Sequence, residues 1–143
     1  MVKRLESDEL QIVVELASSV WHGSHDELLH EFSTTLNNND EITFLKYLGN
    51  TPVGFAQCKL RRDYVEGTHS SPVGYLEGIF IKEQYRKKGY ATELLSACEQ
   101  WAKEHGCSEF ASDCELDNNE SLSFHLKAGF NEVNRIICFT KLI

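Results

Sequence analysis

The amino-acid sequence predicts an α/β fold, in which a mixed central sheet is flanked by helices. Segments with strand-like alternation and segments with helix-like periodicity follow one another along all 143 residues. The helical segment 91–103 joins two strand-like runs, 75–81 and 109–113, and this connection is long enough for a parallel crossover. A chain of this length is expected to form a single domain, over residues 1–143.

Two helices are predicted before the first strand. Ser7 is placed to cap an apolar helical stripe. Ser24 and Glu27 have the spacing of a capping box ahead of a second apolar helical stripe. The two stripes consist of Leu10, Val13, Val14 and Ala17, and of Leu28, Leu29 and Phe32.

The middle of the chain predicts three strands. Residues 42–48 and 53–60 are strand-like and are separated by Gly49-Asn50-Thr51-Pro52, which indicates a hairpin turn. Residues 61–73 are polar and contain Gly67 and Pro72, so we expect a loop there. The apolar run 75–81 is the third strand.

A helix, a strand, a helix and a strand complete the prediction. His105-Gly106 ends the helix over 91–103, and residues 109–113 form a short strand. Asn118 caps a helix that ends at Lys127, and residues 133–142 are expected to form the final strand. The apolar stripe of the first of these helices consists of Ala91, Leu94, Leu95, Cys98, Trp101 and Ala102.

The composition limits the classes of partner. The net charge of −8, from 14 basic and 22 acidic side chains, argues against nucleic acid. The same negative charge favours a cationic substrate, because a negative field attracts cations. The alternative is that the acidity only keeps the protein soluble. The absence of a long apolar run and of a signal peptide predicts a soluble, cytoplasmic protein without a membrane partner. The five cysteines form no Cys-x-x-Cys pair, so no metal site is expected.

The segment Tyr85-Arg86-Lys87-Lys88-Gly89-Tyr90-Ala91-Thr92 lies between a predicted strand and a predicted helix. The first N–H groups of a helix lack internal partners, and the helix dipole adds partial positive charge there. A glycine lets a phosphate approach the backbone closely. This basic turn therefore predicts a cradle for a pyrophosphate-bearing cofactor, while a solvated charge cluster around a loop glycine is the alternative.

Three features together make the chain resemble the GCN5-related N-acetyltransferase (GNAT) superfamily over nearly its whole length. They are Arg86-x-x-Gly89-x-Ala91 after a strand, Asp113 at the end of the next strand, and Asn118 ahead of a helix ending in Ala128-Gly129-Phe130. The resemblance implies a GNAT fold that binds acetyl-CoA as co-substrate. The cofactor-binding residues it implies are Ile79, Phe80, Ile81, Arg86, Lys87, Lys88, Gly89, Tyr90, Ala91, Thr92 and Asn118.

A longer run resembles the aminoglycoside 6'-N-acetyltransferases within that superfamily. The run extends from Asp63-Tyr64-Val65 through Ser71-Pro72-Val73 to Leu76-Glu77-Gly78-Ile79, and Ala111-Ser112-Asp113 and the early Trp21 accompany it. The resemblance implies acetyl transfer to a primary amine of the antibiotic. It also implies that Trp21, Tyr64, Glu77 and Asp113 line the aminoglycoside site.

The chemistry of these residues fits that reaction. Glu77 and Asp113 are candidate catalytic residues, because carboxylates pair with ammonium groups and accept the proton that an amine loses before it attacks. Trp21 and Tyr64 offer flat faces to sugar rings and cations. Buried packing or surface roles are the alternative for each of the four. Cys114 is interpreted as a packing residue, because the family transfers the acetyl group directly.

Two positions depart from the family pattern. His125 stands where many members carry a tyrosine that protonates the leaving thiolate, so that acid stays unassigned. Asn134 stands where the aminoglycoside enzymes often carry an acidic residue, with Glu132 nearby. Acetylation of a cellular polyamine or protein amine, and a non-catalytic acetyl-CoA-binding module, remain alternative functions. A homodimer is possible through the predicted final strand.

Overall fold

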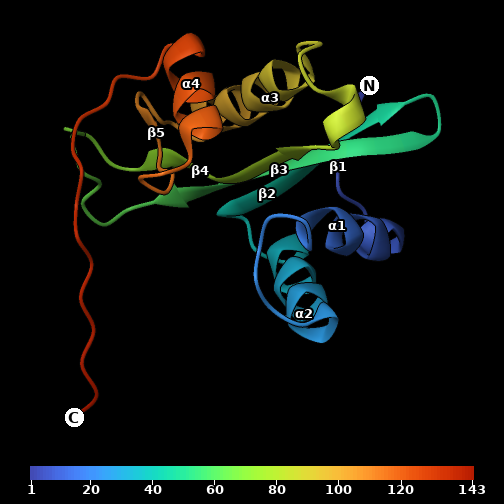
Figure 1. The fold of residues 1–143 in the computed structure, drawn as a ribbon, viewed down its shortest axis with the longest axis horizontal. Helices are drawn as coiled ribbons and strands as arrows, with labels where there is room; N and C mark the ends of the chain where they lie inside the picture. Colours follow the sequence, from blue (N-terminus) through green and yellow to red (C-terminus); the bar gives the residue numbers. More distant parts are fainter.

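The computed structural model describes residues 1–143 and contains one five-stranded sheet with helices on both faces (Figure 1). The strands are adjacent in chain order. They are β1 (Val2–Arg4), β2 (Glu41–Leu48), β3 (Thr51–Arg61), β4 (Val73–Ile81) and β5 (Phe110–Ser112). The helices are α1 (Leu10–Ala17), α2 (His25–Leu36), α3 (Tyr90–Glu104) and α4 (Asn119–Lys127).

The sheet is mixed, as the sequence predicts. Strands β1 to β4 pair antiparallel, and β4 pairs parallel with β5. The parallel pair is connected through α3, which confirms the predicted crossover. The β2–β3 turn is shorter than expected, because Thr51 and Pro52 already belong to β3.

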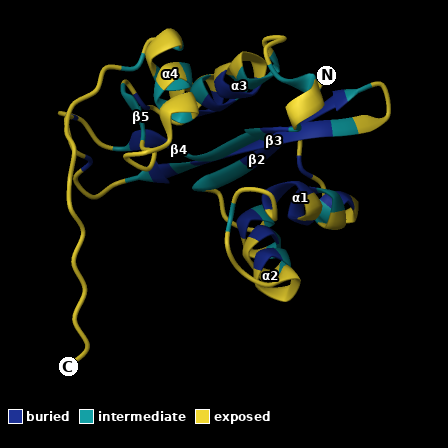
Figure 2. Ribbon diagram, viewed as in Figure 1, coloured by how far each residue is buried: buried dark blue, intermediate teal, exposed yellow.

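Helices α1 and α2 cover one face of the sheet, and α3 and α4 cover the other (Figure 1). Strand alternation divides the side chains of β3 between the two faces. Phe55 packs with Phe32 of α2, whereas Cys58 packs with Leu94 of α3. The predicted α3 stripe is confirmed, since these residues of it are buried: Leu94, Leu95, Cys98, Trp101 and Ala102. Figure 2 shows that the buried residues follow the sheet and the helix faces turned towards it.

Local capping sets the helix starts. Ser24 Oγ accepts a hydrogen bond from the Glu27 N–H, and Glu27 Oε2 accepts one from the Ser24 N–H, which confirms the predicted box. Asn118 caps α4, as predicted. Ser7 does not cap α1. It opens a 3-10 turn, Ser7–Glu9, and the Glu9 carboxylate accepts a hydrogen bond from the Glu6 N–H at 3.0 Å.

One strand was missed by the sequence prediction, and one predicted strand was wrong. Strand β1 was missed, because Val2–Arg4 is only three residues long and owes its conformation to pairing with β2. The predicted final strand at 133–142 has no secondary structure. Residues 131–143 extend away from the sheet (Figure 1). An alternating apolar pattern forms a strand only where a partner strand satisfies its backbone, and no strand of the same chain lies beside it.

No helix in the structure has both the length and the apolar character needed to cross a membrane.

Candidate functional site

The turn that the sequence predicts to be an anion cradle lies between β4 and α3. Gly89 is the N-cap of α3 with φ of 85°, a conformation that favours glycine, and no side chain caps the helix start. A Cβ atom at Gly89 would meet no atom of the chain within 4 Å, so the backbone is open to a ligand. Lys87 and Lys88 are exposed beside it. The N–H groups of Tyr90, Ala91 and Thr92, in the first turn, lack helical acceptors.

Arg86, next to the Gly89 turn, contacts both β4 and α4. Its Nε donates to the Ile81 carbonyl at 2.8 Å, and its Nη1 lies 3.6 Å from Glu120 of α4. The guanidinium also lies over the Phe80 ring, 5.7 Å from its centroid. Arg86 therefore ties the end of β4 to α4 and keeps positive charge beside Gly89.

Strand β4 offers an open edge next to this cradle. Its pairing with β5 ends at Leu76–Ser112, so Ile79, Phe80 and Ile81 have a strand partner only on the β3 side. Backbone groups that face the open side are available to an extended ligand. The predicted cofactor residues on β4 and at the start of α3 thus lie along one continuous path.

Glu77 lies at a bulge in β4. Gln57 is opposite Gly78 and Cys58 is opposite Leu76, so Glu77 has no partner residue on β3. Arg61 donates to both carboxylate oxygens of Glu77, at 2.9 to 3.0 Å, and Lys59 Nζ lies 3.6 Å away. Two cations, Arg61 and Lys59, therefore lie against this one carboxylate.

Asp113 is exposed at the end of β5, and its carboxylate accepts a hydrogen bond from the Tyr75 hydroxyl. Burial and, second to it, this hydrogen bond raise the pKa of the Tyr75 phenol. Tyr75 therefore stays neutral at physiological pH and keeps its proton for Asp113.

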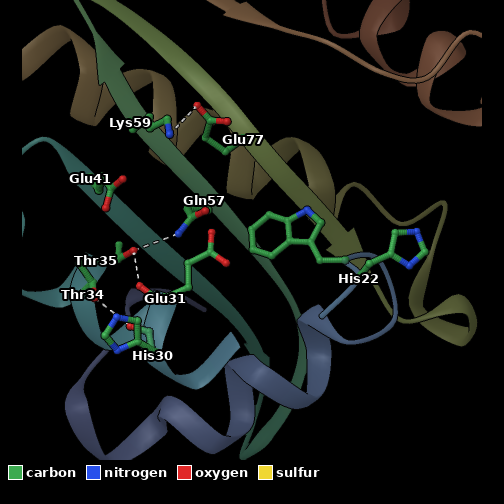
Figure 3. Close-up of a pocket in the computed structure, with 10 residues that line it drawn as sticks. His22, His30, Glu31, Thr34, Thr35, Glu41, Gln57, Lys59 and Glu77 are labelled. Atoms are coloured by element: carbon green, nitrogen blue, oxygen red, sulfur yellow. Dashed lines mark hydrogen bonds and ion pairs between the residues drawn. The ribbon is translucent and has the colours of Figure 1, made fainter. Parts of the chain in front are cut away.

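A cavity of about 590 Å³ opens between α2 and the sheet (Figure 3). Three carboxylates line it, and Glu31 and Glu41 have no ion pair, unlike Glu77. Gln57 donates to Thr35 Oγ1 at 3.2 Å and joins β3 to α2 there. The lining consists of Trp21, His22, His30, Glu31, Thr34, Thr35, Glu41, Gln57, Lys59 and Glu77.

The two predicted aromatic residues are placed differently. Trp21 stacks on Phe32 at 5.6 Å between ring centroids and lines the cavity beside Glu77. Gly78 makes room for it, because a Cβ there would lie 2.3 Å from Trp21 Cζ2. Tyr64 is 76% exposed on the β3–β4 loop and does not line the cavity.

Asp113 also lies outside the cavity lining. The structure thus brings Trp21 and Glu77 together, and it joins Asp113 to them only through other side chains. The sequence prediction missed Glu31 and Glu41, because glutamates on a surface helix and at a strand start look solvated. For β3, the sequence did carry a signal. Strand alternation places Gln57 and Lys59 on the same face of the sheet, and both line the cavity.

Asn118 and His125 lie on α4. The Asn118 side-chain oxygen accepts from the Ser121 N–H at 3.1 Å, so it is engaged as a helix cap. His125 Nδ1 lies 2.7 Å from the Ser121 carbonyl, which indicates a proton on Nδ1. His125 Nε2 lies 2.8 Å from Ser112 Oγ, and this hydroxyl donates to the Leu76 carbonyl at 3.4 Å, where β4 and β5 separate.

Comparisons with known proteins agree with this geometry. Residues 7–130 match the model of the acetyltransferase (GNAT) family. An aminoglycoside N(6')-acetyltransferase type 1 from Serratia marcescens is 35% identical over 145 residues, which cover 100% of this chain and 99% of that protein.

Two solved structures have the same fold. The aminoglycoside antibiotic 6'-N-acetyltransferase AAC(6')-IG from Acinetobacter haemolyticus superposes with a TM-score of 0.96 at 35% identity, covering 100% of this chain and 99% of that one. AAC(6')-Iy, in complex with the bisubstrate analogue CoA-S-monomethyl-acetylneamine, has a TM-score of 0.95 at 32% identity, covering 100% and 98%. The chain belongs to the acetyltransferase (GNAT) family.

Proposed function

We propose that this protein is an aminoglycoside 6'-N-acetyltransferase that uses acetyl-CoA. One observation carries the proposal: Glu77 lies both in the wall of an acidic cavity and at the start of the open edge of β4. An amine bound in the cavity would therefore meet a ligand extended along that edge. The relatives of known activity, one of them in complex with a CoA-based bisubstrate analogue, support the same substrates.

Separate groups of residues bind acetyl-CoA and the aminoglycoside. The Gly89 turn and the first N–H groups of α3 hold the pyrophosphate, and Ile79, Phe80 and Ile81 hold the pantetheine arm. Acetyl-CoA supplies the activated acetyl group. Trp21 gives the aminoglycoside a flat surface, and Glu31 and Glu41 attract its ammonium groups. The proposal includes a cytoplasmic location, because acetyl-CoA is an intracellular metabolite.

Glu77 and Asp113 take different parts in the chemistry. Arg61 and Lys59 already engage the Glu77 carboxylate and fix its position, which suits it to orient an ammonium group more than to take up its proton. Asp113 has no basic partner and is exposed, so it accepts the proton of the attacking amine and passes it to water. The amine nitrogen bonds to the acetyl carbon, the carbon–sulfur bond breaks, and CoA leaves.

A substrate panel tests this function. We expect the specificity constant for neomycin to exceed those for spermidine and for a lysine peptide by at least about 100-fold, because several carboxylates act on one polycation. CoA release with a thiol reagent measures the rates. A higher constant for spermidine or the peptide would contradict the proposal. Acetyl-CoA binding without turnover on any amine would indicate a non-catalytic module.

We also propose a homodimer in which the C-terminal segment 131–143 of each copy packs on the other copy. Four apolar side chains of this segment, Ile136, Ile137, Phe139 and Leu142, are between 73% and 99% exposed. The segment that carries them is an exposed, extended chain that leaves the body of the molecule (Figure 2). Exposed apolar groups of this size and number mark an interaction surface.

The oligomeric state tests the dimer. Light scattering after gel filtration is expected to give twice the mass of one chain, and the pair of changes Ile137→Asp and Phe139→Asp is expected to give a monomer, because it buries charge in the contact. The matched control is Val20→Asp, at an exposed apolar residue outside this segment. A monomeric wild-type protein, or a variant that stays dimeric, would contradict this arrangement.

A further inference from the structure

Arg61, the last residue of β3, lies at the centre of a chain of contacts that connects the two predicted carboxylates. Its Nε and Nη2 both donate to Glu77 Oε1, at 3.0 and 2.9 Å, and Nη2 also donates to Oε2 at 3.0 Å. The side chain of Glu77 is only 18% exposed. A forked pair of this kind fixes the plane of the carboxylate as well as its charge.

The same guanidinium also lies over the ring of Tyr75. Arg61 Cζ lies 3.4 Å from the centroid of the Tyr75 ring, and Tyr75 is 6% exposed. The ring packs with Val65 and Val73 and directs its hydroxyl to Asp113. A cation over the face of a phenol draws electron density from it, which strengthens its hydroxyl group as a donor.

We propose that Arg61 and Tyr75 are positioning residues of the acceptor site, which join Glu77 and Asp113 into one network before the aminoglycoside binds. The inference rests on the proposed function and adds two residues to it. Glu77 and Asp113 are 36 residues apart, Glu77 on β4 and Asp113 directly after the end of β5, and no hydrogen bond joins them. The route through Arg61 and Tyr75 sets the relative position of the two carboxylates.

Lysine does not supply the same link. Lys59, two residues away on the same face of β3, approaches one Glu77 oxygen at 3.6 Å. It lies opposite Tyr75 in the pairing of β3 with β4, but its ammonium group does not stack on the Tyr75 ring as the Arg61 guanidinium does. A single ammonium neutralises charge without fixing a plane, and it cannot stack on a ring while it donates twice. The guanidinium group is therefore the specific requirement.

Steady-state kinetics with neomycin test the role of Arg61. Arg61→Gln is expected to lower the specificity constant for neomycin by at least about 10-fold, because it leaves the half-buried Glu77 without its main donor. The KM for acetyl-CoA is expected to stay within about twofold. Arg61→Lys should recover only part of the loss, because it restores the charge and not the fork.

Arg62→Gln is the matched control. Arg62 is the next residue along the chain, and its ion pair with Asp40 at 2.8 Å is on the surface, with the Arg62 side chain 58% exposed. Its loss should leave both constants within about twofold. An unchanged or increased specificity constant in Arg61→Gln would overturn the inference, since Arg61 would then only compete with the substrate for Glu77. Full recovery with Arg61→Lys would overturn the requirement for the guanidinium.

A double-mutant cycle tests the network even if neomycin is not a substrate. The free energy of unfolding is measured for Arg61→Gln, Asp113→Asn and their combination, and then for the same three in a Tyr75→Phe background. We expect the two changes to be coupled with Tyr75 present and to become additive with Tyr75→Phe, because the hydroxyl carries the connection. Additive effects with Tyr75 present would overturn the inference without bearing on the proposed activity.

Discussion

Replacing Gly89 by valine is expected to weaken acetyl-CoA binding by at least about 30-fold while the protein remains folded. The Cβ position at Gly89 is empty space in the structure, so a larger side chain has no neighbour of the chain to displace. It would instead cover the N–H groups at the start of α3 that are predicted to receive the pyrophosphate. Calorimetric titration with acetyl-CoA measures the effect.

Gly106→Val separates this loss from backbone strain. Gly106 has φ of 86°, against 85° for Gly89, and its Cβ position is equally open. Both changes therefore carry a similar cost of about 1–2 kcal/mol for a left-handed conformation. We expect similar losses in thermal stability from the two variants and a loss of acetyl-CoA affinity from Gly89→Val alone. Equal acetyl-CoA affinities would show that the cradle has been misplaced.

Asp113→Asn is expected to reduce kcat with neomycin by about 100-fold, because the amide accepts no proton from the attacking amine. Glu77→Gln is expected to act mainly on the KM for neomycin, raising it by about 10-fold, because it removes the carboxylate that orients the ammonium. Steady-state kinetics with each substrate varied in turn distinguish the two effects. Acetyl-CoA affinity should stay within about twofold in both variants.

Asp117→Asn is the control for charge. It removes one negative charge from the exposed loop that also carries Asp113, and its side chain makes no hydrogen bond or ion pair in the structure. Kinetics close to wild type are expected. A loss in Asp117→Asn equal to that in Asp113→Asn would reduce the role of Asp113 to its contribution to the general negative field. Normal kinetics in Asp113→Asn and Glu77→Gln would remove both residues from the site.

Most of the fold was predictable because its signals are local. The α3 stripe follows from a period of 3.6 residues, and the Ser24–Glu27 box and the Asn118 cap each depend on groups three residues apart. Strand β1 and the segment 131–143 were not predictable in this way. Whether a short or terminal segment forms a strand depends on a partner strand, which its own residues do not specify.

The candidate site was predictable in part, for a related reason. The Gly89 turn lies within one short segment, so its residues identify it. The pairing of Glu77 with Arg61 depends on the register between β3 and β4 and on the bulge at Glu77, and neither can be read from alternation. The cavity carboxylates Glu31 and Glu41 become neighbours of Glu77 only when α2 packs on the sheet.

The most direct test of the central claim compares CoA release with neomycin and with paromomycin. These aminoglycosides differ at the 6' position, where neomycin has an amine and paromomycin a hydroxyl group. We expect release with acetyl-CoA and neomycin and none above background with paromomycin, because only the amine is acetylated. Equal release with both would place the acetylated amine elsewhere, and release with neither would contradict aminoglycoside acetylation altogether.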